Sequence, residues 1–107
     1  MNFMSYLVHR GAIMTAEWTF LTNHSQVLLC LARNGGRMTA REIAEVVGIT
    51  ERAVQRILDD LEETGYITRF RDGRQNRYEI HPERPMRHPQ QQGRAIKDLL
   101  ELFAYMR

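Results

Sequence analysis

The chain has 107 residues, of which 43% are hydrophobic and 26% charged, and its formal net charge at pH 7 is +2. This length predicts one domain with a modest core, and no apolar run approaches the roughly 18 residues that a membrane-spanning helix needs. The first nine residues, MNFMSYLVH, are apolar but lack the basic lead and the small-residue cleavage site of a signal peptide. We therefore expect a cytoplasmic protein that does not contact membranes.

The charge is unevenly distributed along the chain. Residues 57–65 carry four carboxylates and no basic side chain, and the segments on both sides have a net positive charge. Every basic residue except Lys97 is arginine, whose planar guanidinium suits bidentate contacts with phosphate and guanine. By itself this is a weak indication of a nucleic-acid partner, because a mutational bias of the genome produces the same composition.

Residues 1–14 have no clear hydrophobic period. Met14 and the Thr-Ala-Glu-Trp that follows it are typical of a natural chain start. We interpret residues 1–14 as an N-terminal extension of little functional weight. The sequence leaves open whether residues 1–13 belong to the natural chain.

The first helix is expected over residues 25–34. Thr22, Asn23 and Ser25 are each suitable as its N-cap, and apolar residues recur within it at helical spacing. The single cysteine, Cys30, lies in its most apolar run and has no partner for an internal disulfide. We interpret Cys30 as a core residue rather than as a redox or ligand-binding group.

Two further helices follow, joined by a short turn. Thr39 and Glu42 have the spacing of a capping box, and Gly48 supplies the permissive backbone that ends this helix. Thr50 is the N-cap of the next helix, which Gly65 ends. Two short helices around a glycine-containing turn predict a helix-turn-helix. The third helix has an apolar stripe at i, i+3, i+4 and i+7, formed by Val54, Ile57, Leu58 and Leu61.

A β-hairpin is expected next. Residues 66–70 and 77–81 are rich in aromatic and β-branched side chains, which favour strands. Asp72-Gly73 between them is a strong turn signal. The fold class is therefore mainly α with a small β-hairpin, a winged helix-turn-helix that occupies residues 15–81.

The composition then changes to a linker, residues 82–92, whose three prolines and three consecutive glutamines predict an extended chain. A terminal helix is expected over residues 93–107. Its apolar stripe packs either on the domain itself or on a second copy, and the linker favours the second copy because it can carry the helix away. The predicted dimer interface consists of Ile96, Leu99, Leu100 and Phe103.

Several stretches resemble winged-helix regulators of the MarR and ArsR types. They are R-E-I-A-E-V-V-G-I-T-E-R-A-V-Q-R-I-L-D-D-L-E-E-T-G-Y-I, the wing-like R-F-R-D-G-R-Q-N-R-Y and the opening W-T-F-L-T-N-H. The similarity extends from about Trp18 to Phe103, and it departs from the usual pattern at Arg41, where alanine is typical. It implies sequence-specific DNA binding by a cytoplasmic dimer. ArsR-type metal sensors carry Cys or His clusters, whereas this chain has one Cys and four scattered His, so we expect no metal site.

The third helix is the expected recognition helix. Its N-terminal half carries residues whose side chains suit base edges: arginine binds guanine O6 and N7, and glutamine binds adenine. Arg52 and Arg56 are i, i+4 neighbours and extend from one face. Thr50 either caps the helix or binds phosphate.

In the hairpin, alternation places Arg69 and Arg71 on one side, and Arg74 lies near the tip, where it can enter the minor groove. The predicted DNA-binding residues are Thr39, Thr50, Glu51, Arg52, Gln55, Arg56, Arg69, Arg71, Arg74, Asn76 and Arg77.

The C-terminal half of the same helix carries the acidic block, which phosphates would repel. We expect that half to face away from DNA and to be solvated, rather than to bind a metal or act in catalysis. No nucleophile triad, phosphate-binding glycine loop or paired zinc motif is present. We therefore expect neither an enzyme nor a cofactor.

The expected function is that of a homodimeric transcriptional regulator that binds double-stranded DNA. The alternative is a winged-helix module that binds proteins and not DNA, which the low net charge mildly favours. An RNA-binding winged helix is a third possibility, but A-form RNA closes its major groove to a helix. The sequence does not identify the operator, the regulated genes, the sign of regulation or any small-molecule effector.

Overall fold

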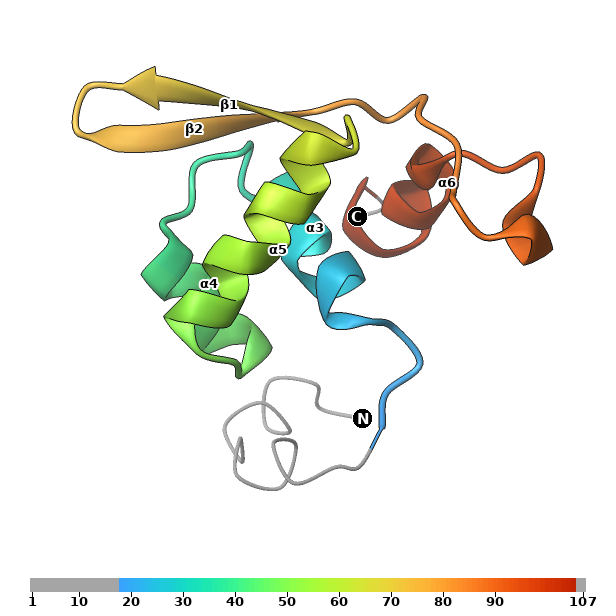
Figure 1. Cartoon of the computed structure of the whole chain (residues 1–107), viewed down its shortest axis with the longest axis horizontal. Helices are drawn as coiled ribbons and strands as arrows, with labels where there is room; N and C mark the ends of the chain where they lie inside the picture. The colour runs from blue at the N-terminus through green and yellow to red at the C-terminus, as the bar shows by residue number, and fades with distance from the viewer. Residues whose placement is uncertain (1–17, 106–107) are drawn as a thin grey trace.

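The computed structural model describes residues 18–105, so the predicted extension over residues 1–14 lies outside the described residues. Three helices precede a two-stranded antiparallel sheet, and short helices end the chain (Figure 1), which confirms the predicted fold class. No helix in this described part is long and apolar enough to cross a membrane. The elements are α3 (Asn23–Arg33), α4 (Ala40–Val47), α5 (Glu51–Glu63), β1 (Ile67–Asp72), β2 (Gln75–Ile80), the 3₁₀ turn η1 (Pro89–Gln91), α6 (Ile96–Leu100) and the π-helical η2 (Glu101–Tyr105).

Side-chain caps begin each of the first three helices. Thr22 caps α3, where its Oγ1 accepts from the Ser25 N–H at 3.1 Å. Thr39 and Glu42 form the predicted capping box at the start of α4, with both reciprocal bonds present. Thr50 caps α5 by accepting from the Ala53 N–H at 3.0 Å. These bonds satisfy helix-terminal amides that have no partner within the helix, so the starts of α4 and α5 agree with the sequence prediction.

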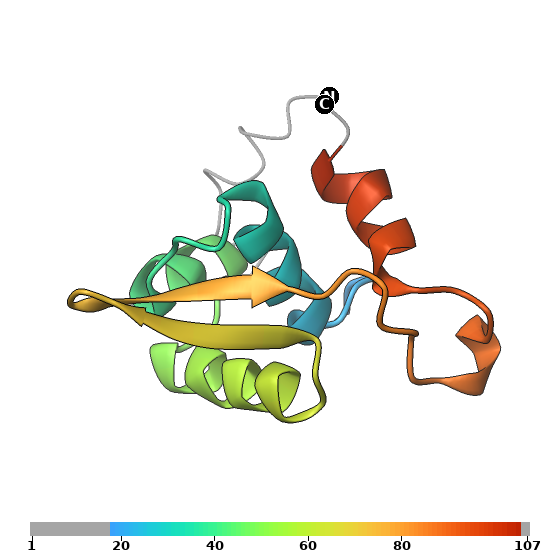
Figure 2. The ribbon, with the colours of Figure 1, turned by 90° about the horizontal axis from the view of Figure 1, so that it is seen from above.

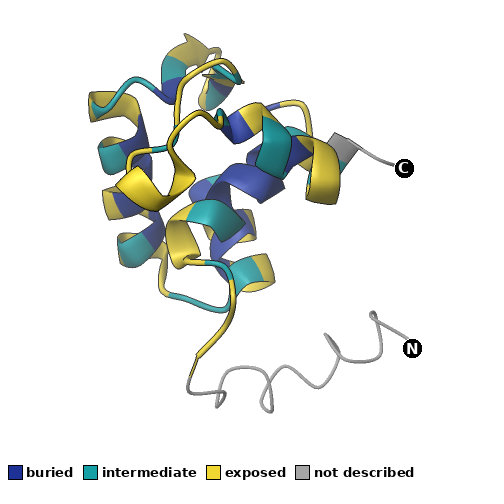
Figure 3. Cartoon of the chain, turned by 90° about the vertical axis from the view of Figure 1, so that its right-hand side faces the viewer, coloured by how far each residue is buried: buried dark blue, intermediate teal, exposed yellow. Residues whose placement is uncertain are grey.

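The helix-turn-helix is formed by α4, a tight turn and α5. Gly48 has a φ of +87°, which L-residues with side chains rarely adopt, and its N–H bonds the Ala44 carbonyl at 2.8 Å. Apolar stripes from all three helices meet in one core that also contains Tyr66, Ile67 and Tyr78, and Figure 3 shows the buried residues facing inward. Cys30 is part of this core, as predicted, and burial raises the pKa of its thiol even though Arg33 acts in the opposite direction.

The hairpin of β1 and β2, here called the wing, is longer than the sequence predicted. Both strands continue into the polar residues at the tip, where Asp72 pairs with Gln75 around a two-residue turn, Gly73-Arg74. Its inner end begins at Ile67 and not at Tyr66. The difference arises because ladder hydrogen bonds extend past the apolar part of each strand, where composition no longer indicates a strand.

The segment predicted as an extended linker, residues 82–92, instead folds back on the domain. Pro85 forms an isolated bridge with Ala95, the Met86 N–H bonds the Arg94 carbonyl at 2.9 Å, and the Tyr66 hydroxyl donates to the Pro85 carbonyl at 2.5 Å. Proline is compatible with the first turn of a helix, and η1 begins at Pro89. The prolines therefore do not keep this segment extended.

The terminal helix also differs from the prediction of one helix over residues 93–107. Regular α-helix covers only Ile96–Leu100, after which the chain continues as η2. The predicted dimer stripe is divided: Ile96 and Leu100 are buried in the core of their own chain, Leu99 is half-buried, and Phe103 is exposed. The folded-back segment brings the end of the chain onto α3, where η2 packs and Arg33 donates to the Phe103 carbonyl at 2.7 Å. Two of the four stripe residues therefore pack within the chain.

Candidate nucleic-acid interface

The N-terminal half of α5 presents polar side chains to solvent. Val54, Ile57, Leu58 and Leu61 hold the opposite side of the helix in the core. Because one side is fixed by burial, the polar side chains of the first two turns are held outward. These side chains, here called the reading face, are those of Thr50, Glu51, Arg52, Gln55 and Arg56, and all five residues are exposed.

The two arginines of the reading face have no ion-pair partner among residues 18–104. Glu51 is the one acidic member of the face, in the first turn of the helix, where a carboxylate is favourable next to the helix dipole. The Thr50 hydroxyl accepts its capping bond from Ala53, and a hydroxyl in this role still has its own hydrogen to donate. The face therefore offers two unpaired guanidinium groups, an amide and a hydroxyl.

Two acidic residues of the C-terminal half of α5 bind Arg69. Its guanidinium lies 2.9 Å from an Asp59 oxygen and 3.2 Å from a Glu62 oxygen, and its Cζ lies 5.9 Å from the centre of the Tyr78 ring. The Arg69 side chain is only 21% exposed. The structure thus places Arg69 between the wing and α5, where its charge is neutralised, and this pairing makes it less available for the DNA contact that the sequence predicts for it.

The remaining predicted wing residues lie toward the tip. Arg74 is exposed beside Gly73, and the exposed Arg71 donates from Nε to the Gly73 carbonyl at 3.2 Å. Arg77 is half-buried, with its guanidinium 5.2 Å from the centre of the Phe70 ring and 3.9 Å from Asp72. Asn76 pairs with Arg71 across the strands and is half-buried. Arg71 and Arg74 are therefore the most available cations of the wing tip.

Thr39 and two arginines near α4 complete the basic surroundings. Thr39, predicted to contact DNA, is half-buried and its hydroxyl caps α4. Arg37, which sequence reasoning missed, lies 3.2 Å from Asp72 and so links the α3–α4 loop to the wing tip. Arg41, also missed, is exposed on the first turn of α4. No local pattern marks Arg37, whereas Arg41 was visible as the departure from the typical alanine.

The two predicted contact regions both lie away from the C-terminal segment. Figure 2 shows the first turns of α5 and the wing tip toward the same side, while the segment after the wing and α6 lie on the other. Figure 1 shows that the wing crosses the C-terminal end of α5, with the first turns at the opposite end of the helix. No group of three or more His, Cys, Asp or Glu residues in the described part of the chain is arranged to hold a metal ion. The first turns of α5 and the wing tip offer hydrogen-bonding groups and unpaired positive charge, with Glu51 as the one carboxylate of the reading face.

The order of three helices followed by an antiparallel hairpin is consistent with a winged helix. Residues 20–80 match the family described as a domain of unknown function, DUF7343, and the chain belongs to that family. It is also similar to the uncharacterized protein MJ1254 of Methanocaldococcus jannaschii, with 32% identity over 66 residues. That similarity covers 62% of this chain but spans only 14% of the relative's length.

Proposed function

We propose that the protein is a transcriptional regulator that binds specific double-stranded DNA sequences as a homodimer. The reading face of α5 enters the major groove, and the wing tip contacts the backbone or the minor groove. The observation that carries this proposal is the pair of exposed arginines on the first two turns of α5, neither of which has an acidic partner in the described part of the chain.

The chemistry of the reading face suits base recognition. Arg52 and Arg56 follow one another along a single helix face, so each can bind guanine O6 and N7 at a neighbouring step. Gln55 lies between them in sequence and suits adenine N6 and N7. The N-terminus of α5 adds the positive end of the helix dipole. In this arrangement Thr50 contacts phosphate through the hydroxyl hydrogen that capping leaves free.

The separation of charge along α5 supports the same orientation of this helix on DNA, with its first turns toward the duplex. At the far end of the helix, Asp59 and Glu62 bind Arg69, and Asp60 lies 2.9 Å from His24. The positive charge of Arg69 offsets the charge of Asp59 and Glu62, which reduces their repulsion of phosphate. The wing contributes Arg74 and Arg71 from the tip, where a hairpin adjacent to the helix can follow the DNA backbone.

The apolar surface proposed for the homodimer interface is narrower than the one predicted from the sequence. Leu102 is 61% exposed and Phe103 is 41% exposed on η2, and Leu99 is half-buried beside them. Exposed large apolar side chains gathered at one end of a small domain favour a partner. A two-fold dimer would place two recognition helices about 34 Å apart, one turn of DNA, on a nearly palindromic site.

Salt dependence of DNA binding tests the proposal. Fluorescence anisotropy with duplexes selected from a random pool should give nanomolar to micromolar affinity that falls steeply from about 50 to about 300 mM salt, because each neutralised phosphate releases counterions. Genome-wide binding would then identify the operator.

Absence of binding to every selected duplex at low salt would contradict the proposal. It would favour the second candidate, a winged-helix module that binds proteins, which is compatible with the low net charge of +2. An affinity for an A-form RNA duplex equal to that for the selected DNA duplex would contradict the proposed binding in the major groove, because the A-form major groove is too narrow for a helix.

A further inference from the structure

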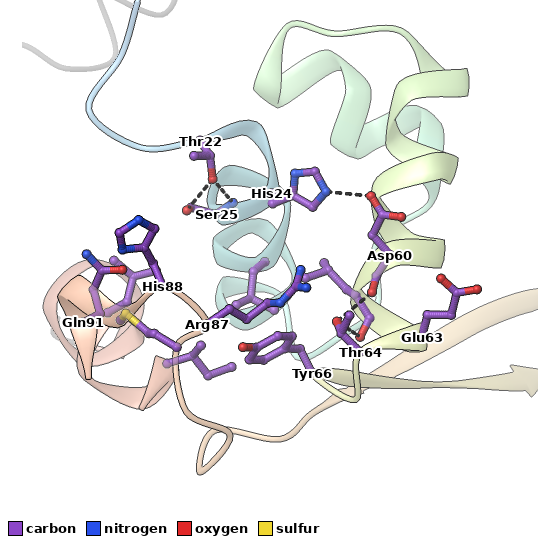
Figure 4. A pocket seen from close by; sticks show the side chains of 15 residues that line it. Thr22, His24, Ser25, Asp60, Glu63, Thr64, Tyr66, Arg87, His88 and Gln91 are labelled. Atoms are coloured by element: carbon purple, nitrogen blue, oxygen red, sulfur yellow. Dashed lines mark hydrogen bonds and ion pairs between the residues drawn. The ribbon is translucent and has the colours of Figure 1, made fainter. Parts of the chain in front are cut away.

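A cleft of about 720 Å³ lies between the C-terminal end of α5 and the segment that folds back after the wing. The first turn of α3 and the last turns of α5 form one wall, and residues of the 86–91 stretch form the other (Figure 4). Its volume falls within the range of about 300–1,000 Å³ that small-molecule sites occupy. It lies at the opposite end of α5 from the reading face.

The floor of the cleft is apolar. Core and half-buried side chains from four parts of the chain line it: Leu28 from α3, Leu61 from α5, Met86 from the folded-back segment, and Ile96 with Leu99 from α6. A floor of this kind favours a ligand with an apolar body, because its burial removes apolar surface from water on both partners.

One wall of the cleft is acidic. Asp60 and Glu63 lie one turn apart on α5, and both line the cleft. One Asp60 oxygen lies 2.9 Å from the His24 ring nitrogen, and the other carries no hydrogen bond or ion pair in the described residues. Glu63 forms no ion pair with residues 18–104. Carboxylate oxygens are therefore free to accept from a bound ammonium group.

The facing wall is basic. In Figure 4 the Arg87 side chain extends into the cleft toward α5. It forms no ion pair with Asp60, Glu63 or any other carboxylate in residues 18–104. A second cleft of about 420 Å³ also has Glu63 and Arg87 in its lining. Opposite charges thus face one another across open space, above an apolar floor.

We propose that this cleft binds an amphipathic zwitterion, of which an α-amino acid with a large apolar side chain is the simplest form. The ammonium group donates to Asp60 and Glu63, the carboxylate accepts from Arg87, and the side chain lies on Leu28 and Leu61. A ligand with a single charge would leave one wall unmatched. The site shares Leu99 with the apolar surface proposed for the dimer but involves no residue of the reading face, so ligand binding is measured separately from DNA binding.

Three probes with the same phenylethyl skeleton test the assignment on the full chain. L-phenylalanine carries both charges, 2-phenylethylamine lacks the carboxylate, and 3-phenylpropionate lacks the ammonium group. Titrations followed by amide chemical shifts should show saturable binding of phenylalanine with a Kd on the order of 1 mM, as expected for so small a ligand in an open cleft. Each single-charge probe should bind about fivefold more weakly, the loss of one exposed charge contact.

Substitutions at two exposed residues test which wall of the cleft binds which charge of the ligand. Arg87→Gln should weaken phenylalanine about fivefold and leave 2-phenylethylamine unaffected or tighter, and Glu63→Gln should weaken phenylalanine and 2-phenylethylamine but not 3-phenylpropionate. Arg94→Gln and Glu83→Gln are matched controls, since both residues are exposed and outside the cleft lining. Thermal unfolding by circular dichroism verifies that each variant is folded.

Three results would overturn the inference. The first is no saturable shift of cleft amides with phenylalanine. The second is equal affinity for phenylalanine and a single-charge probe. The third is equal effects of the cleft variants and their controls on phenylalanine binding. Because the titrations contain no DNA, none of these results bears on the proposed DNA binding.

Discussion

Gly36 is a residue whose backbone conformation helps to fix the position of the wing. Its φ is +78°, and a Cβ at this position would lie 1.9 Å from the Tyr78 carbonyl oxygen. Its own carbonyl accepts from the Tyr78 N–H at 2.9 Å. The α3–α4 loop therefore packs backbone to backbone against β2. The neighbouring Gly35 also has a positive φ, +63°, but a Cβ there would meet nothing within 4 Å.

Alanine at these two glycines should separate steric clash from backbone strain. Gly36→Ala combines both and should lower the free energy of unfolding by about 3 kcal/mol, whereas Gly35→Ala carries strain alone and should cost about 1 kcal/mol. Urea unfolding followed by circular dichroism measures both values. Equal losses in the two variants would mean that the loop does not pack closely against β2.

At the scale of elements, the sequence predicted best where side chains act locally. Thr39, Glu42 and Thr50 mark helix starts through bonds to amides three residues away, so the starts of α4 and α5 could be read directly. The structure of the wing tip and of the segment after residue 81 could not be predicted from the sequence. It depends on cross-strand bonds and on the distant bridge between Pro85 and Ala95.

In the candidate site, too, the sequence predicted the local arrangement and not the long-range contacts. Alternation correctly placed Arg69 and Arg71 on one face of β1, since they pair with Tyr78 and Asn76 in alternate rungs of the hairpin, separated by the pair of Phe70 and Arg77. It did not show that the inner part of that face lies against the acidic half of α5. Which charges meet is decided by how the wing packs on the helix, and a one-dimensional pattern does not contain that information.

The two wing arginines should therefore respond differently to replacement. Arg69→Ala removes two ion pairs and should cost about 1 kcal/mol of unfolding free energy, while the slope of log affinity against log salt stays unchanged. Arg74→Ala should leave stability unchanged, weaken binding to many DNA sequences together and reduce that slope by about one. A reduced slope for Arg69→Ala with wild-type stability would contradict the placement of Arg69.

At the scale of the whole molecule, burial changes which residues can form a dimer. Leu100 is fully buried in its own chain, so Leu100→Glu should unfold the domain rather than dissociate it. Leu102 and Phe103 remain exposed on η2. Replacement of both by glutamate should give a folded monomer, because the apolar area lost belongs to the interface and not to the core.

Sedimentation equilibrium at tens of micromolar, with circular dichroism on the same samples, measures this difference. The wild type should be dimeric, and the double variant at Leu102 and Phe103 should be monomeric with an unchanged spectrum. Its affinity for a two-half-site duplex should collapse, because the half-sites are no longer linked. A monomeric wild type would contradict the dimer proposal.

The central claim is that α5 reads DNA sequence, and the affinity ratio between a selected duplex and a scrambled duplex tests it most directly. Wild-type protein should prefer the selected duplex by at least about a hundredfold. Arg52→Ala and Arg56→Ala should each remove about 1–3 kcal/mol of that preference, and Arg94→Ala, at an exposed residue after the wing and outside the reading face, should retain it. An unchanged ratio in both reading-face variants would contradict the account.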